Sequence, residues 1–337
     1  MKSVIISIIM FLFLILIHEF GHFIIAKKSG IKVNEFAIGM GPKIFSKQKG
    51  ETLYSVNLFP IGGYCAMEGE DDESDDERSF DKAPAYKRFF TILAGPLTNL
   101  IFAGLIFSFV VFNTGKASTT IGQFTQNSPI KSQGFKIGDE IVEISENKVK
   151  EFSDISKNLE NYYENHKKDD EITVKVKRNK KEIEKKVRVK FEGEKPLLGF
   201  IPKNKDVGFF EAIKIGTKEV FSMMALMFTV LKNLFTGKLG FSALSGPVGV
   251  VKEMGRQANL GIMNLLFFLG YISVNLGFFN LLPIPALDGS KIFTSLFEMI
   301  TKKRVNKKIE EKVTIGGFIL LLSLIFIITI KDLINLF

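Results

Sequence analysis

The sequence predicts a polytopic α-helical membrane protein, with about four transmembrane helices, a membrane-associated β-loop and one inserted α+β domain. Three observations support this fold class. Apolar residues make up 46% of the 337-residue chain and collect in runs too long for ordinary core helices. The early part of residues 30–88, "FAIGMGPKIFSKQKGETLYSVNLFPIGGY", alternates in polarity and is rich in glycine. Residues 116–190 are polar, with short strand-like stretches such as "EITVKVKR".

Charge and cysteine content narrow the function classes. The formal net charge is +9, and it is carried by lysines of the middle third and of short loops, which suits an anionic membrane surface. No aromatic-plus-basic pattern accompanies this charge, so a nucleic-acid partner is not expected. Cys65 is the one cysteine, which excludes an internal disulfide and a multi-cysteine metal site.

Four segments are long enough to cross a bilayer, which requires roughly 17–25 apolar residues. They are Val4–Ala26, about Phe89–Val111, about Ile262–Leu282 and about Val313–Ile330. The first resembles a signal peptide, but no small-x-small cleavage site follows it. We therefore interpret it as an uncleaved span, and assign residues 1–29, 89–115, 261–290 and 291–337 to the parts that contain the four helices.

The segments between the spans have distinct patterns. The early part of residues 30–88 predicts a β-hairpin or small sheet, and Glu68–Ser79 within the same segment predicts an acidic, solvated loop. Residues 193–260 predict a linker and an interfacial amphipathic helix, because charged residues recur in the otherwise apolar stretch Gly208–Thr236. A fifth span is the alternative for that stretch.

The soluble segment 116–192 resembles a PDZ domain at "NSPIKSQGFKIGDEIVEISENKV" (Asn127–Val149). The matching positions are Ser128, Gly134, Gly138, Asp139 and Ile141. Ile130 and Phe135 depart from the commonest residues of that family. The resemblance implies a groove for a peptide carboxyl end, or a bulk that excludes large substrates; a generic β-domain is the alternative.

Basic residues in a short loop predict the orientation of the spans in the membrane. "TKKRVNKK" (Thr301–Lys308) lies between the third and fourth spans and should be cytoplasmic. Residues 30–88 then also lie on the cytoplasmic side, and the 116–192 domain lies outside. The lysines of that domain argue against this, but long loops translocate regardless of charge.

Ionisable side chains interrupt the first span at His18-Glu19-Phe20-Gly21-His22. Positions i and i+4 share one helix face, so His18 and His22 can direct two imidazoles at one metal ion, with Glu19 near enough to accept a proton. A pair of core histidines is the alternative. It fits poorly within a bilayer, where an ionisable group costs roughly 2.5–3.5 kcal/mol.

A third ligand is required, since catalytic zinc sites usually have three protein ligands. His166 is the remaining histidine, but it lies in the hydrophilic "NHKKDD" of the soluble domain. Asp288 is the better candidate, because it is the only acid in the apolar stretch 261–289. Its alternative role is that of a helix N-cap.

Together these motifs resemble the site-2 protease family of intramembrane zinc metalloproteases, of the RseP/RasP type (regulator of sigma-E protease). "HEFGH", "AGPLTN" (Ala94–Asn99), "SGPVGV" (Ser245–Val250) and "NLLPIPALDG" (Asn280–Gly289) occur in the family's order. The PDZ-like segment lies between the second and third spans, as in that family. "DGSK" stands where many relatives have Asp-Gly-Gly-His, and some relatives carry two PDZ domains where one fits here.

The resemblance implies roles for individual residues. His18, His22 and Asp288 would bind Zn²⁺, and Glu19 would be the catalytic general base. Substrate would be held by residues from three motifs: Asn280, Pro283, Pro285, Asn99, Gly62 and Gly63.

The resemblance also implies an activity and a location. The expected function is regulated intramembrane proteolysis of single-pass membrane proteins, such as anti-sigma factors or signal-peptide remnants. The expected location is the bacterial cytoplasmic (inner) membrane, with the site near its cytoplasmic side and the PDZ-like domain outside.

Two other function classes remain open from the sequence. A membrane-anchored zinc peptidase for soluble peptides would take its third ligand from a soluble domain. A non-enzymatic PDZ scaffold or a metal transporter is the second; a transporter should carry acids or histidines on several spans, and the second and fourth spans carry none.

Overall fold

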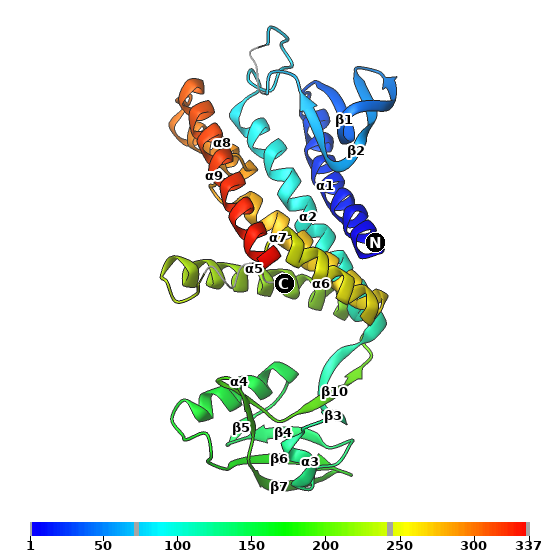
Figure 1. The fold of residues 1–337 in the computed structure, drawn as a ribbon, viewed down its shortest axis with the longest axis vertical. Helices are drawn as coiled ribbons and strands as arrows, with labels where there is room; N and C mark the ends of the chain where they lie inside the picture. The colour runs from blue at the N-terminus through cyan, green and yellow to red at the C-terminus, as the bar shows by residue number, and fades with distance from the viewer. Residues whose placement is uncertain (1, 71–73, 241–244, 335–337) are drawn as a thin grey trace. The chain divides into compact units, whose positions relative to one another are not determined.

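A computed structural model describes residues 2–70, 74–240 and 245–334. The chain forms two compact units, which are described separately (Figure 1). One combines residues 1–110 with 212–337, and the other is residues 111–211. Three residues of the predicted acidic loop (71–73) and four of the predicted linker (241–244) lie outside the described residues.

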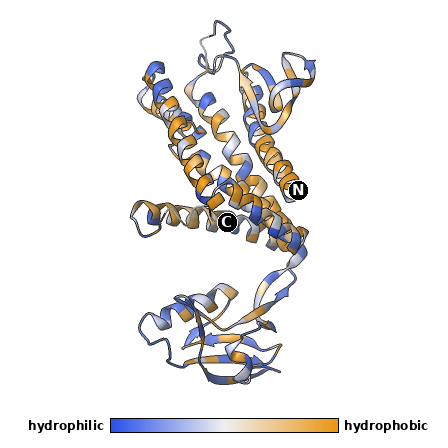
Figure 2. Ribbon diagram, viewed as in Figure 1, coloured by the Kyte–Doolittle hydropathy of each residue, from blue (hydrophilic) through white to orange (hydrophobic). Residues whose placement is uncertain are grey.

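The described residues contain four helices that are long and apolar enough to cross a membrane. They are α1 (Lys2–Ser29), α2 (Ala85–Thr114), α7 (Ile262–Leu281) and α9 (Lys307–Ile334). Figure 2 shows apolar residues along all four. Each contains a predicted span, because an apolar run in lipid can satisfy its backbone hydrogen bonds only by forming a helix.

Close contacts fix the directions of three of these helices. Gly21 of α1 lies against Ala94 of α2: a Cβ at Gly21 would be 2.5 Å from the Ala94 carbonyl oxygen. Ser273 of α7 donates a hydrogen bond to the Asn99 carbonyl of α2 (2.8 Å). On α1, His18 and His22 meet Asn99 and Thr91 of α2. On α7, Gly270 and Gly277 meet Phe107 and Pro96 of α2. Helices α1 and α7 are therefore each antiparallel to α2, and parallel to each other.

Helix α6 (Pro247–Leu260) lies where several of these helices begin or end. Its Gly255 approaches Ser3 at the start of α1, and its own end leads directly into α7. Its first turn binds Asp332, near the end of α9. The starts of α1 and α7 and the end of α9 therefore lie at one face of the bundle.

Helix α5 (Phe209–Phe235) is where the sequence predicts an interfacial helix. It is not one of the four candidate spans found among the described residues. Lys214, Lys218 and Glu219 interrupt its apolar residues. The interfacial location stays a prediction.

A long hairpin lies beside α1. Strands β1 (Val33–Lys49) and β2 (Thr52–Met67) pair antiparallel, as the alternating segment predicts. A Cβ at Gly63 of β2 would be 3.9 Å from Ile15 of α1. The hairpin thus brings a strand alongside the helix that carries the histidines.

Parts of the acidic segment after β2 are held by ion pairs. Asp76 pairs with Lys32 (2.9 Å). Glu70 pairs with Lys291 (2.8 Å) of α8 (Asp288–Thr301). Both carboxylates are partly exposed, and the solvated loop at Glu68–Ser79 stays a prediction.

Residues 111–211 form a mixed α/β unit with its own core. One sheet has the strand order β10-β3-β4-β6-β7, with β5 paired to β4. Its strands are β3 (Lys116–Phe124), β4 (Glu140–Ile144), β5 (Asn147–Lys148), β6 (Ile172–Arg178), β7 (Lys181–Val187) and β10 (Phe200–Lys205). The remaining elements are α3 (Pro129–Ser132), α4 (Phe152–Tyr163), and the pair β8 (Lys190–Glu192) and β9 (Lys195–Leu197).

This unit extends beyond the range 116–192 expected from the sequence. Strand β10 pairs with β3 and so belongs to the same sheet. Ile121, Ile141 and Val174 of neighbouring strands are fully buried in its core. The PDZ assignment stays a prediction.

Candidate metal centre

Two imidazoles meet on one face of α1. His18 and His22 are one helical turn apart, and their Nε2 atoms lie 3.2 Å from each other. Their side chains are 12% and 6% exposed. The spacing predicted from the sequence thus places two ligand-type nitrogens side by side.

Asp288 joins them from the other end of the sequence. Its Oδ2 lies 2.8 Å from His18 Nε2 and 3.3 Å from His22 Nε2. It is the first residue of α8, whose N-cap is Leu287. The alternative role of Asp288 as an N-cap is therefore wrong.

The turn before Asp288 determines where its carboxylate lies. Residues 282–287 are not helical, and Ala286 adopts a left-handed φ of 72°. Gly289 packs against the end of α7: a Cβ there would be 1.7 Å from the Leu282 carbonyl oxygen. Only glycine allows the chain to fold back this closely, and the fold-back directs Asp288 toward α1.

Helix α2 orients the ring of His22. The His22 Nδ1–H donates to the Thr91 carbonyl, at 2.9 Å. A proton on Nδ1 leaves a lone pair on Nε2, which is the nitrogen that faces Asp288. The backbone of α2 thus selects the tautomer that a metal ligand requires.

Asn99 of α2 performs the same role for His18. Its Nδ2 lies 3.2 Å from His18 Nδ1, while its Oδ1 is buried without a hydrogen bond. A half turn of the amide exchanges these two atoms and gives Oδ1 the ring N–H as a donor. That orientation satisfies the amide oxygen and leaves a lone pair on His18 Nε2.

Gly95 leaves room for both rings. A Cβ at this position would lie 2.3 Å from His22 Nε2 and 2.9 Å from His18 Nε2. The "AGP" of α2 is therefore the wall on which the two imidazoles rest. A methyl group there would displace the ligand nitrogens.

The donor set fits a divalent metal ion. Asp288 Oδ2 is buried and, among the described residues, receives no hydrogen bond. Two neutral imidazoles would turn nitrogen lone pairs toward it, and a bound cation would then reconcile the three groups. The donor separations of 2.8, 3.2 and 3.3 Å are close to the edges of a tetrahedron with bonds of about 2.0–2.1 Å, the lengths zinc makes to nitrogen and oxygen.

Comparison with known proteins agrees with this geometry. A family model described as "Peptidase family M50" matches residues 6–324. The chain belongs to peptidase family M50, the site-2 protease family. The match runs from the first candidate span into the fourth, so this M50 protein is a membrane-embedded member of a protease family.

Three relatives are named "Putative zinc metalloprotease". The relative from Clostridium acetobutylicum is 41% identical over 98% of this chain and 97% of its own length. Those from Clostridium perfringens and Fusobacterium nucleatum are each 36% identical, over 98% of both chains. The likeness therefore covers nearly the whole of this M50 protein.

Glu19 of this M50 protein contacts the hairpin. Its Oε2 accepts a hydrogen bond from the backbone N–H of Cys65 in β2, at 3.1 Å. Burial raises the pKa of the Cys65 thiol, so the sulfur stays protonated beside the site. Cys65 thus contributes its backbone N–H, and its side chain packs as a small apolar group.

The structure places the expected substrate-binding residues at various distances from this centre. Asn99 contacts His18, and Pro283 and Pro285 lie in the turn that leads to Asp288. The Asn280 amide donates to the Leu276 carbonyl of its own helix. Gly62 and Gly63 lie in β2, two to three residues before the Cys65 N–H that binds Glu19.

His166 is not brought to this centre. Its ring stacks on Tyr162, and its Nδ1 lies 2.7 Å from the Tyr162 carbonyl oxygen within the other unit. Among the described residues, the group that could hold a metal ion consists of His18, His22 and Asp288.

Sequence reasoning did not assign roles to three parts of the site. Thr91 acts through a backbone carbonyl and Cys65 through a backbone N–H, so neither side chain carries a signal. Gly95 lies in the "AGPLTN" motif, and a glycine beside Pro96 inside an apolar helix is a signal for close approach.

Proposed function

We propose that this protein is a zinc-dependent intramembrane endopeptidase that cleaves the membrane-spanning segments of single-pass membrane proteins. The observation that carries the proposal is the convergence of His18, His22 and Asp288 within a bundle of candidate spans. The expected biological role is regulated intramembrane proteolysis, with anti-sigma factors or signal-peptide remnants as substrates. Relatives named as zinc metalloproteases support the choice of metal.

His18 Nε2, His22 Nε2 and Asp288 Oδ2 are the atoms that would hold the metal. Zinc bound there supplies Lewis acidity, which makes water a stronger acid and polarises the carbonyl of a peptide bond. Thr91 and Asn99 hold the two imidazole rings in orientations that direct each Nε2 at the metal position.

Glu19 is the proposed general base. The Cys65 N–H occupies its Oε2, which fixes the carboxylate and leaves Oε1 to accept a proton from the attacking water. The same carboxyl group then donates that proton to the leaving amine. The hairpin thereby couples the position of the base to the position of β2.

Substrate must unwind before it can react, because helical hydrogen bonds protect its peptide bonds in lipid. Two nearby segments can replace those bonds. The Leu282–Leu287 turn is non-helical and precedes Asp288 directly. Residues 63–67 of strand β2 pair on one edge with residues 33–38 of β1, so in the described part of the chain their other edge can add a substrate strand.

Charge supports a cytoplasmic site. Lys27 and Lys28 end α1, and Lys307 and Lys308 begin α9. Because α1 and α7 start where α9 ends, these basic residues lie at the opposite face of the bundle together. Basic short segments favour the cytoplasm, so we place the metal centre near the cytoplasmic side of the bacterial inner membrane and residues 111–211 outside.

The variant Glu19→Gln tests the proposal. Cleavage of a membrane-spanning model substrate in detergent or proteoliposomes should fall by at least about a thousandfold, since the base is lost. Zinc content should stay at the wild-type level, because Glu19 is not a ligand.

Glu219→Gln in α5 is the matched control and should cleave normally. Full activity of Glu19→Gln would remove Glu19 as the base. Efficient cleavage of a soluble peptide, with the membrane substrate left intact, would favour the anchored-peptidase alternative.

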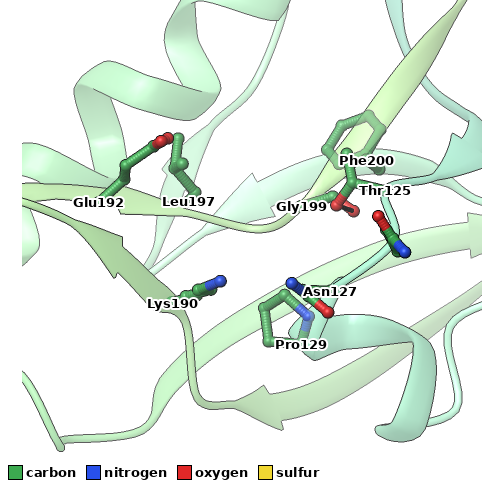
Figure 3. A pocket seen from close by; sticks show the side chains of 9 residues that line it. Thr125, Asn127, Pro129, Lys190, Glu192, Leu197, Gly199 and Phe200 are labelled. Atoms are coloured by element: carbon green, nitrogen blue, oxygen red, sulfur yellow. Dashed lines mark hydrogen bonds between the residues drawn. The ribbon is translucent and has the colours of Figure 1, made fainter.

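A second site is supported by a cavity in the 111–211 unit. It has a volume of about 460 Å³ and is lined by Thr125, Gln126, Asn127, Pro129, Lys190, Glu192, Leu197, Gly199 and Phe200. Figure 3 shows the Lys190 amine and the Asn127 amide reaching into one space, with Leu197 and Phe200 beyond them. An ammonium beside apolar side chains suits a peptide that ends in an apolar residue with a free carboxylate.

Peptide affinity tests this second site. Peptides with an apolar last residue should bind the full chain, and amidation of their ends or the variant Lys190→Gln should weaken binding at least about tenfold, the loss expected for one charged contact. Lys195→Gln on the neighbouring strand is the control. Equal binding of free and amidated ends would leave this unit as a size filter.

A further inference from the structure

Two backbone N–H groups of the "SGPVGV" motif (Ser245–Val250) bind a buried carboxylate away from the metal centre. Asp332 Oδ2, near the end of α9, accepts the backbone N–H of Gly246 at 2.8 Å and that of Gly249 at 2.9 Å. The Asp332 side chain is 8% exposed. These three residues are called the α9 clip below.

The clip supplies what the start of α6 lacks. The N-cap of α6 is Gly246, which has no side chain to bind the free N–H groups of the first turn. Asp332, which belongs to α9, binds these N–H groups in the way that an N-cap side chain normally does, and its negative charge is favourable at a helix N-terminus.

Glycine is needed at the clip for steric reasons. A Cβ at Gly246 would lie 2.9 Å from Asp332 Oδ2 and 2.8 Å from Ile328 Cγ2. The motif is therefore shaped to receive the last turn of α9.

Helix α9 has few other attachments. In the most apolar stretch of α9, 6% is buried inside the protein, whereas the corresponding share is 28–39% in the other three candidate spans. Its one buried residue among those described is Gly317. Glu310 Oε1 also accepts a hydrogen bond from Thr294 of α8, at 3.2 Å.

Gly317 lies on the turn that leads to Asp288. A Cβ at Gly317 would be 2.3 Å from Pro285 Cβ and 2.8 Å from the Pro285 carbonyl oxygen. Such an approach exists only at one rotation and tilt of the helix. The adjacent Gly316 faces open space, with nothing within 4 Å of a Cβ built there.

The contacts of Glu310 and Gly317 hold the first half of α9, and the clip holds its end. Gly317 and Asp332 are 15 residues apart on one continuous helix, a separation of roughly 22 Å at the helical rise of about 1.5 Å per residue. Loss of the clip lets α9 tilt and rotate, which moves neighbouring side chains of α9 against Pro285.

We propose that Asp332 is a positioning residue for the Leu282–Asp288 turn: by binding Gly246 and Gly249 it holds Gly317 of α9 against Pro285. Its importance for catalysis rests on the proposed function, because this turn carries Asp288. The coupling itself is a property of the fold and is measured without any activity.

Hydrogen–deuterium exchange of the full-length protein tests the coupling. In Asp332→Ala, backbone exchange should become at least tenfold faster in the first turn of α6 and also in peptides covering residues 282–288. Asp332→Asn keeps an acceptor oxygen and should lie between wild type and alanine in both places. Acceleration confined to α6 would overturn the proposal.

A pair of adjacent glycines separates coupling from general loosening. Gly317→Ala should accelerate exchange in residues 282–288 and leave the first turn of α6 unchanged, whereas Gly316→Ala should change neither. Equal effects of the two variants, or none at residues 282–288, would contradict the contact with Pro285. Both variants add the same methyl group to α9, so helix propensity does not separate them.

The proposal can fail while the proposed function stands. If Asp332→Ala keeps wild-type zinc content and cleavage, and exchange at residues 282–288 is unchanged, the proposed role of Asp332 is overturned and the proposed metal centre is not affected. If Glu19→Gln keeps its activity, the proposed role of Glu19 is overturned, and the coupling measured by exchange is not affected.

Discussion

Asp139 and Asp288 each have a carboxylate oxygen shielded from solvent, and the surroundings of the two residues differ. Asp139, in the 111–211 unit, is fully buried and accepts hydrogen bonds from Arg178 Nε (2.6 Å), Arg178 Nη2 (2.7 Å) and the Lys136 N–H (2.9 Å). Asp288, in the helical bundle, faces two imidazole nitrogens whose other ring atoms are engaged by α2.

The comparison shows how a structural acid differs from a ligand. The chain itself neutralises Asp139, since Arg178 supplies both charge and donors. The groups nearest Asp288 Oδ2 are the two imidazole nitrogens, and no arginine or lysine pairs with it among the described residues. A cation bound between the three atoms would neutralise this carboxylate.

The largest expected effect comes from Asp288→Asn. The neutral amide is a weak ligand, so the several kcal/mol of stabilisation from zinc are lost and cleavage should fall by about a thousandfold or more. Proteolysis of a membrane-spanning substrate measures this. Asp139→Asn, measured in the same assay, should retain activity within a few-fold; similar losses in the two variants would erase the distinction between them.

Gly95→Ala should have the next largest effect. Its methyl group would lie 2.3 Å from His22 Nε2, so the imidazoles must move and zinc affinity should fall by about 10–100-fold, as when supporting contacts of a ligand are removed. Competition with a chromophoric chelator gives the affinity. Gly104→Ala on the same helix, where the nearest atom is 3.7 Å away, is the control and should bind zinc normally.

Asp139→Asn should act on stability instead of on the metal. It removes the charge that Arg178 faces and should lower the free energy of unfolding of the 111–211 unit by about 1–3 kcal/mol. Thermal unfolding followed by proteolysis of that unit measures the change. An unaltered unfolding temperature would mean that the pair contributes little.

The smallest effect concerns pH. Burial raises the pKa of Asp139, but the hydrogen bonds from Arg178 and the Lys136 N–H outweigh it and hold the pKa below its ordinary value. The pair therefore stabilises fully above the unfolded pKa of about 3.9, and this contribution is lost as pH falls through the lower folded pKa. Unfolding of the wild type should depend on pH below about 4 more steeply than that of Asp139→Asn.

The sequence predicted much of the bundle, because lipid allows few solutions. The runs around Val4–Ala26 and Val313–Ile330 had to be helices, and the spacing of His18 and His22 then fixed their common face. The partnership with Asp288 came from family resemblance and from its isolation in an apolar stretch.

Contacts made by backbone atoms, or by the close packing that glycine allows, could not be predicted from the sequence. The Thr91 carbonyl, the Cys65 N–H and the seat at Gly95 depend on how α2 and β2 pack against α1. The α9 clip joins Asp332 to two glycines that lie 83 and 86 positions earlier in the sequence, and the donors are backbone N–H groups. Side-chain pattern carries no record of such pairings.

Zinc content in the matched pair Asp288→Asn and Asp139→Asn tests the central claim most directly. Purified wild type and Asp139→Asn should each carry one zinc per chain, and Asp288→Asn should carry almost none after mild chelation. Stoichiometric zinc in Asp288→Asn, or equal loss from both variants, would contradict a metal centre built from His18, His22 and Asp288.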